Sequence, residues 1–214
     1  MPTTWMPPSP VELKGRNVTL RALLPERDVA VLYFGSHRTP EKEAIWNYLP
    51  YGPFGSQEEM GAYYSENMTG KADPMVWTVF SNEGDKQIGT TALLAVVPAH
   101  GRAEIGHVWF TPAVHRTKAN TESQYLLLSY LFDDLGYRRM EWKCDSLNHP
   151  SRTAAARMGF SFEGRFRQHM MLRGKNRDTD WFAMTDKEWP RCRGNFERWL
   201  YSGEKVSLME LNNG

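Results

Sequence analysis

The sequence contains little cysteine: only Cys144 and Cys192 occur among its 214 residues. Two thiols cannot make a disulfide framework or a four-ligand zinc site. We therefore expect a protein of a reducing compartment, without a bound metal.

Long apolar runs and an excess of charge of one sign are also absent. No apolar run approaches the length needed to span a membrane, and residues 1–15 have neither the basic nor the apolar region of a signal peptide. The 26 basic and 25 acidic residues leave a net charge of +1, which gives no support to nucleic-acid or membrane-surface binding. We expect a cytoplasmic protein that binds neither nucleic acid nor a membrane.

The composition is that of a globular protein, with 41% hydrophobic and 24% charged residues. The residue pattern predicts strands over 18–24, 76–80, 87–97, 102–111, 139–147, 162–172 and 179–185, and helices over 26–34, 41–49, 56–68, 119–135 and 187–201. We interpret the chain as a proline-rich extended lead-in (1–15), one mixed α/β domain (16–190), and a closing helix and tail (191–214).

The stretch 138–160 has the clearest local pattern. Met140, Trp142 and Cys144 alternate with charged residues, which is typical of a strand with one apolar face. A polar turn and a short helix that ends at Gly159 follow the strand. A strand end, a turn and a helix start together often form a ligand site, because polar side chains and free N–H groups then point the same way. The alternative is an ordinary strand–turn–helix unit.

The order of the elements resembles that of the GNAT acetyltransferases, and several motifs are similar to their RimJ/RimL-like branch. The matching stretches are LKGRNVTLR (13–21), AEIGHVW (103–109), LGYRRMEW (135–142), Asn148 with Ser151, RMGF (157–160), EG (163–164) and FR (166–167). The resemblance covers roughly 11–190. It implies an α/β (α+β) fold with a mixed, mostly antiparallel sheet of about seven strands and flanking helices. It also implies acetyl transfer from acetyl-CoA to a primary amine.

The resemblance implies two coenzyme-binding segments. The backbone of Val108, Trp109 and Phe110 would polarise the thioester carbonyl. The pyrophosphate would lie at the start of the long helix, on Arg116, Thr117, Lys118, Ala119, Asn120 and Thr121. Ala119 and Thr121 replace the glycines that are usual there. We expect the helix-start N–H groups to face the anion still; the alternative is a solvated basic loop.

The resemblance also assigns the proton transfers. Ser151 would protonate the departing thiolate, since Ala155 stands where many relatives have a tyrosine, and Asn148 would hold the pantetheine or a water. Alternatively, Asn148 and Ser151 have only structural roles, as a turn residue and a helix cap. Glu104 is the first candidate for the base and His107 the second, on the opposite face of a regular strand. Glu104 could also be a surface carboxylate.

The acceptor is expected to be a small-molecule amine or a peptide N-terminal amine. Deprotonating an α-amine at pH 7 costs about 1.4 kcal/mol and a lysine side chain about 4.6 kcal/mol, so an untuned carboxylate base suits the former. The candidate pocket residues are Trp46, Tyr48, Tyr51, Phe54, Trp77 and His107; the aromatic loop could instead pack on itself. A homodimer remains open, as does a regulatory acyl-CoA-binding module with little turnover.

Overall fold

The computed structural model describes residues 4–213, which form two compact units. The N-terminal unit comprises 8–96 and 106–127, and the C-terminal unit comprises 4–7, 97–105 and 128–213. Residues 1–3 of the expected lead-in and Gly214 of the expected tail lie outside the described residues. Within 4–213, no helix is long and apolar enough to cross a bilayer.

The strands of the described chain are β1 (Leu13–Lys14), β2 (Val18–Ala22), β3 (Met75–Ser81), β4 (Lys86–Val97), β5 (Arg102–Phe110), β6 (Arg139–Asp145), β7 (Ser161–Leu172) and β8 (Lys175–Thr185). Hydrogen-bonded neighbours follow the order β1-β2-β3-β4-β5-β6-β8-β7. The β5–β6 pair is parallel, whereas β1–β2, β2–β3, β3–β4, β6–β8 and β7–β8 are antiparallel. This confirms the expected mixed, mostly antiparallel sheet.

The described sheet has eight strands instead of about seven, because β1 was not predicted as a separate strand. It contains only Leu13 and Lys14, which pair with Leu20 and Thr19 of β2. Two residues are too few to show the alternation by which a strand is recognised in a sequence.

The helices are α1 (Pro25–Ser36), α2 (Pro40–Glu43), α3 (Gln57–Asn67), α4 (Ala119–Ser129), α5 (His149–Arg157), α6 (Trp189–Tyr201) and α7 (Leu208–Asn213). Short 3-10 turns cover Ala44–Trp46, Pro98–His100 and Pro112–Val114, and a π-helical turn covers Tyr130–Asp134. The expected start of α3 is confirmed, since the Ser56 hydroxyl accepts a hydrogen bond from the Glu59 N–H.

Two predicted helices differ from those observed. The single helix expected over 41–49 is wrong: α2 ends at Glu43 and a 3-10 turn follows. The turn brings the Trp46 indole inward, where it donates to the Ser36 carbonyl at 3.0 Å. The long helix expected over 119–135 is regular only to Ser129 and ends in the π-helical turn. Helix α7 was not predicted.

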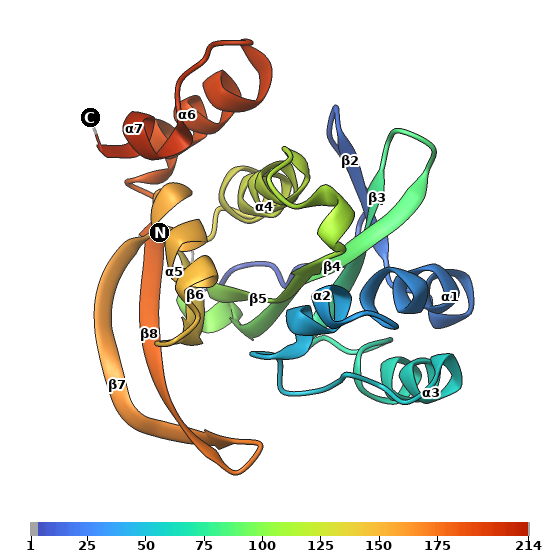
Figure 1. The fold of residues 1–214 in the computed structure, drawn as a ribbon. Helices are drawn as coiled ribbons and strands as arrows, with labels where there is room; N and C mark the ends of the chain where they lie inside the picture. Colours follow the sequence, from blue (N-terminus) through green and yellow to red (C-terminus); the bar gives the residue numbers. More distant parts are fainter. Residues whose placement is uncertain (1–3, 214) are drawn as a thin grey trace. The chain divides into compact units, whose positions relative to one another are not determined.

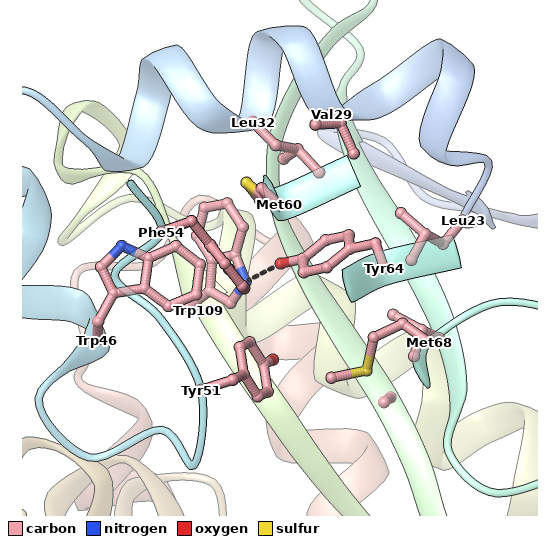
Figure 2. Packing of buried hydrophobic residues seen from close by; sticks show 12 residues of the cluster. Leu23, Val29, Leu32, Trp46, Tyr51, Phe54, Met60, Tyr64, Met68 and Trp109 are labelled. Atoms are coloured by element: carbon pink, nitrogen blue, oxygen red, sulfur yellow. Dashed lines mark hydrogen bonds between the residues drawn. The ribbon is translucent and has the colours of Figure 1, made fainter. Parts of the chain in front are cut away.

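A buried aromatic and aliphatic cluster forms the core of the N-terminal unit (Figure 2). Trp46, Tyr51, Phe54, Tyr64 and Trp109 supply its rings. Figure 2 shows the hydrogen bond between the Tyr64 hydroxyl and the Trp109 indole nitrogen, which are 3.3 Å apart. This bond satisfies an indole N–H that is otherwise enclosed by apolar side chains.

In the C-terminal unit, β7 and β8 form a long hairpin, drawn in orange in Figure 1. Helix α5 contacts the hairpin through Arg152, which lies 2.7 Å from the fully buried carboxylate of Asp180 on β8. Arg165 of β7 binds the same carboxylate at 2.6 Å. The hairpin is therefore held to α5 on one of its faces, while its other face carries the residues considered below.

Candidate active site

Strand β5 is irregular at His107, which has a positive φ of 48°. The His107 carbonyl accepts a hydrogen bond from the Thr90 hydroxyl at 3.0 Å. Gly89 of β4 lies so close to β5 that a Cβ there would collide with the Trp109 carbonyl. The alternation of side chains along β5 is interrupted at this point. The expectation that Glu104 and His107 lie on opposite faces held only for a regular strand, so it does not apply here.

The His107 imidazole lies beside Tyr51, with 5.4 Å between the ring centroids. Burial lowers the pKa of His107 to about 4, against an opposing effect of the Asp73 charge. A group with this pKa is neutral at pH 7 and has little affinity for a proton there. The environment therefore argues against His107 as the base.

This burial predicts an acid-dependent loss of stability in the N-terminal unit. The folded-state pKa of His107 lies below the ordinary value of about 6.5, so the unfolded chain binds more protons as the pH falls from about 6.5 to about 4. Over that window His107 should remove about 3 kcal/mol from the free energy of unfolding, with no further loss below it. Urea unfolding at pH 7 and pH 4 measures this.

The matched variant is His107→Asn, because asparagine tolerates a positive φ. It should lose less stability on acidification than the wild type, whereas His100→Asn, at an exposed position, should behave like the wild type. Equal acid sensitivity in the wild type and His107→Asn would contradict the prediction.

The expected pyrophosphate segment has a backbone that does not need glycine. Neither Ala119 nor Thr121 has a positive φ; the positive value, 61°, falls at Arg116. The Thr117 hydroxyl donates to the Val114 carbonyl at 2.7 Å and accepts from the Ala119 N–H at 3.3 Å, which fixes the turn before α4. The alanine and threonine in the glycine positions therefore cause no backbone strain.

The side chains of the same segment differ in exposure. Arg116 and Thr117 are exposed, Lys118 and Asn120 are partly buried, and Ala119 and Thr121 are buried. Asn120 accepts a hydrogen bond from the Gln124 amide at 3.0 Å, one turn along α4. The segment thus presents two cations beside the N-terminus of an 11-residue helix, a combination that suits an anion.

Glu122 anchors this end of α4 within the N-terminal unit. Its fully buried carboxylate accepts hydrogen bonds from the N–H groups of Arg16, Asn17 and Val18 at 3.1, 2.7 and 2.8 Å. The Asn17 side chain donates a fourth bond at 3.0 Å. A Cβ at Gly15 would collide with the carboxylate, so glycine is required for this close approach.

Glu104, in the C-terminal unit, is a buried carboxylate and not a surface one. It is 8% exposed, and Oε2 lies 2.6 Å from the Lys143 ammonium. Lys143 also lies 3.4 Å from Glu141 and 3.9 Å from the centroid of the Trp181 ring. Burial raises the pKa of Glu104, and the Lys143 hydrogen bond and charge partly offset that rise. A carboxylate with a raised pKa is a better proton acceptor, which suits a base.

Asn148 and Ser151 lie at the start of α5, and Asn148 is the helix cap. Its side-chain oxygen accepts from the Ser151 N–H at 3.2 Å. The Ser151 hydroxyl oxygen in turn accepts from the Trp142 indole N–H at 2.9 Å. Burial raises the pKa of the Cys144 thiol, and a hydrogen bond with Ser151 opposes that rise. The serine hydroxyl therefore has a fixed position beside a sulfur atom.

The aromatic residues expected to line the acceptor pocket lie mostly in the core. Trp46 and Trp77 are fully buried, and Tyr51 and Phe54 are nearly so. Tyr48 is the exception, with 36% of its surface exposed. Aromatic side chains of this kind pack inward because their rings bury much apolar surface.

Three residues of interest were not predicted. Lys143 occupies a charged position on the alternating β6 strand, and this alternation was the only signal for it. Glu122 directly follows the expected pyrophosphate segment and was given no role. Arg177 had no local signal, because its significance depends on β8 pairing with strands far along the chain. No group of three or more metal-ligating side chains occurs within 4–213.

Comparison with known proteins shows the family. Residues 17–161 match the family described as an acetyltransferase (GNAT) domain. The crystal structure of a GCN5-related N-acetyltransferase from Brucella melitensis is 36% identical and has a TM-score of 0.93, covering 99% of this chain and 98% of that chain. An uncharacterized N-acetyltransferase, p20 from Bacillus licheniformis, is 26% identical over 174 residues, or 80% of this chain and 94% of the relative. The chain belongs to the GNAT acetyltransferase family.

A more distant structure shares the fold. The ribosomal L7/L12 alpha-N-protein acetyltransferase RimL, in complex with coenzyme A, is 21% identical with a TM-score of 0.69, covering 82% of this chain and 98% of that chain. The expected GNAT fold is thus confirmed, while membership of the RimJ/RimL-like branch stays a prediction.

Proposed function

We propose that the protein is an acetyl-CoA-dependent N-acetyltransferase of the RimJ/RimL-like branch, which transfers the acetyl group directly to a primary amine. The observation that carries this proposal is the buried Glu104–Lys143 pair in a chain of the GNAT family. Coenzyme A in the complex with RimL supports the choice of coenzyme.

In this proposal the N-terminal unit binds the coenzyme. The pyrophosphate lies at the N-terminus of α4, where Arg116, Lys118 and the Thr117 hydroxyl add charge and hydrogen bonds. The backbone of 108–110 polarises the thioester carbonyl. The absence of positive φ at Ala119 and Thr121 supports this, because the segment forms the turn and the helix start without glycine.

The C-terminal unit supplies the proton transfers. Glu104 accepts a proton from the acceptor amine, directly or through water, and the amine nitrogen attacks the thioester carbon. When the resulting tetrahedral intermediate collapses, Ser151 donates its hydroxyl proton to the departing thiolate. The Trp142 N–H supports this role, since donation to the Ser151 oxygen makes the hydroxyl more acidic. Asn148 fixes the turn that carries Ser151.

The acceptor in this proposal is a small-molecule amine or a peptide N-terminal amine. The candidates to contact it are the partly exposed Tyr48 and His107, because the other expected pocket residues, Trp46, Tyr51, Phe54 and Trp77, are buried.

Thermal denaturation with acetyl-CoA tests the coenzyme assignment. Coenzyme at 100 times its Kd should add about 2.7 kcal/mol to the free energy of unfolding. For a chain of this length the melting temperature should then rise by roughly 5–11 °C. The variant Arg116→Ala should show a smaller rise, and the exposed Arg173→Ala should show the same rise as the wild type. No rise at millimolar acetyl-CoA would contradict the proposal.

Ser151→Ala tests the acid. Loss of the hydroxyl should lower kcat for CoA release by about 10- to 100-fold with little change in KM, because the proton is needed only as the thiolate leaves. Thr153→Ala, at an exposed position on the same helix, is the control and should keep the wild-type rate. If Ser151→Ala retains full kcat, then solvent or another group protonates the thiolate.

A further inference from the structure

One face of the C-terminal unit brings together residues from four strands. The β5–β6 register sets Glu104 opposite Glu141, and the β6–β8 register sets Lys143 opposite Trp181 and Asp145 opposite Thr179. Because side chains alternate along a strand, Glu104, Lys143, Trp181 and Thr179 share a face. The contacts of Lys143 with Glu104 and with the Trp181 ring agree with this placement.

The β7–β8 hairpin adds an aromatic group to the same face. The Phe166 and Trp181 ring centroids lie 4.6 Å apart, and the His169 ring lies 5.4 Å from Phe166 and 5.9 Å from Trp181. Phe166 is 48% exposed, and His169 is exposed as well. This face therefore offers ring surface to a ligand, next to the carboxylate proposed as the base.

Arg177 lies at the edge of this aromatic group. Its Nε donates to the Thr179 hydroxyl oxygen at 3.2 Å, and the same hydroxyl lies 3.0 Å from Nδ1 of His169. Thr179 is almost fully buried, so it gives the guanidinium a rigid support. The Arg177 charge also lowers the pKa of Glu104, although less than Lys143 does.

The terminal nitrogens of Arg177 differ from those of neighbouring arginines. In the same unit, terminal nitrogens of Arg139 donate to Glu163, and a terminal nitrogen of Arg165 donates to Asp180. Within residues 4–213, the terminal nitrogens of Arg177 have no hydrogen bond or ion pair. A partly buried guanidinium with an anchored Nε and unpaired terminal donors fits a carboxylate, which accepts two parallel hydrogen bonds from such a fork.

We propose that the acceptor amine also carries a carboxylate, which Arg177 binds, while Phe166 and Trp181 contact the rest of the molecule. The substrate class is a free amino acid or a similar amino-carboxylate. This inference rests on the proposed function, since it takes Glu104 to be the base that receives the proton of the amine. It narrows the acceptor from primary amines in general to amines with a nearby negative charge.

The experiment measures binding, so it does not depend on turnover. Titration calorimetry compares N-acetyl-L-phenylalanine, N-acetyl-L-leucine and N-acetyl-L-methionine, which resemble the products, with the corresponding amides. The wild type should bind at least one acid about tenfold or more tightly than its amide. In Arg177→Met the ratio of the affinity for the acid to the affinity for its amide should fall to about one. Arg177→Lys should keep only part of the preference for the acid, because a lysine ammonium cannot donate two parallel hydrogen bonds to the carboxylate.

Arg167→Met is the matched control. Arg167 is an exposed arginine on the same hairpin, so the variant should keep the preference for the acid. An equal loss in Arg167→Met would mean that only the general positive charge matters, which overturns the proposal. It is also overturned if the wild type prefers no acid over its amide, or if Arg177→Met keeps the preference.

Release of CoA, measured separately, distinguishes the two ideas. Arg177-dependent binding of the acids without any CoA release with amine acceptors would leave the carboxylate site standing and refute the transferase. Equal CoA release with amino acids and their amides would support the transferase and refute the role of Arg177.

Discussion

Replacement of Glu104 by glutamine is expected to slow CoA release in the presence of an amine by about 10²–10⁴-fold, the range typical of a lost general base. Glutamine keeps the size of the side chain and can still accept a hydrogen bond from Lys143, but it cannot take up the proton of the amine. The loss should appear in kcat, with the affinity for acetyl-CoA unchanged. Glu163→Gln is the control, because Glu163 is a more exposed carboxylate that is paired with Arg139.

The pH dependence provides a second readout of the same pair. In the proposed role of base, Glu104 must be ionised, so the rate should rise with pH as this buried carboxyl loses its proton. In Lys143→Met the opposing charge is gone, and the pKa of Glu104 should rise further. The acidic limb of the pH–rate profile should then move to higher pH, and Lys143→Arg should restore it. An unchanged limb in Lys143→Met, or a fully active Glu104→Gln, would contradict the assignment.

Replacement of Glu122 by alanine should lower the free energy of unfolding by about 3–5 kcal/mol, the cost of leaving buried polar groups without a partner. The three N–H groups of 16–18 would lose their acceptor, and the variant would leave a cavity beside Gly15. At about 2–4 °C for each kcal/mol, the melting temperature should fall by roughly 6–20 °C.

Glu66→Ala is the matched control for Glu122→Ala. Glu66 is an exposed glutamate on α3 of the same unit, and its replacement should change stability by less than about 0.5 kcal/mol. Differential scanning calorimetry of the three proteins measures the effect. Equal melting temperatures for Glu122→Ala and the wild type would show that the buried carboxylate does not hold the 15–18 turn to α4.

Most strands could be predicted from the sequence, because the alternation of apolar and polar residues and the turn residues that bound a strand lie close together along the chain. Strand β6 and the start of α3 are examples, since each depends on neighbours within a few residues. The helix expected over 41–49 was wrong because Trp46 is drawn into the core of its unit, and this tertiary contact overrides helix propensity. Strand β1 was too short to carry a pattern.

Less of the candidate site could be predicted from the sequence. The motifs made Glu104 and Ser151 candidates for the proton transfers, but they could not show that Lys143 binds Glu104 or that Trp142 binds Ser151. Those contacts depend on the pairing of strands and on the packing of α5, which no spacing rule contains. Arg177 illustrates the same limit, because only the folded hairpin sets it beside Thr179 and the aromatic group.

The proposed transfer of acetyl groups from acetyl-CoA to amines can be tested by measuring both products of the reaction together. The protein is incubated with acetyl-CoA and a mixture of amino acids, peptides with free N-termini and lysine peptides with blocked N-termini. Free CoA is then measured as thiol and the acetylated amines by mass spectrometry. We predict equal amounts of CoA and acetylated amine, with α-amines acetylated in preference to lysine side chains. Intact acetyl-CoA with every amine, or CoA release without an acetylated amine, would contradict the account.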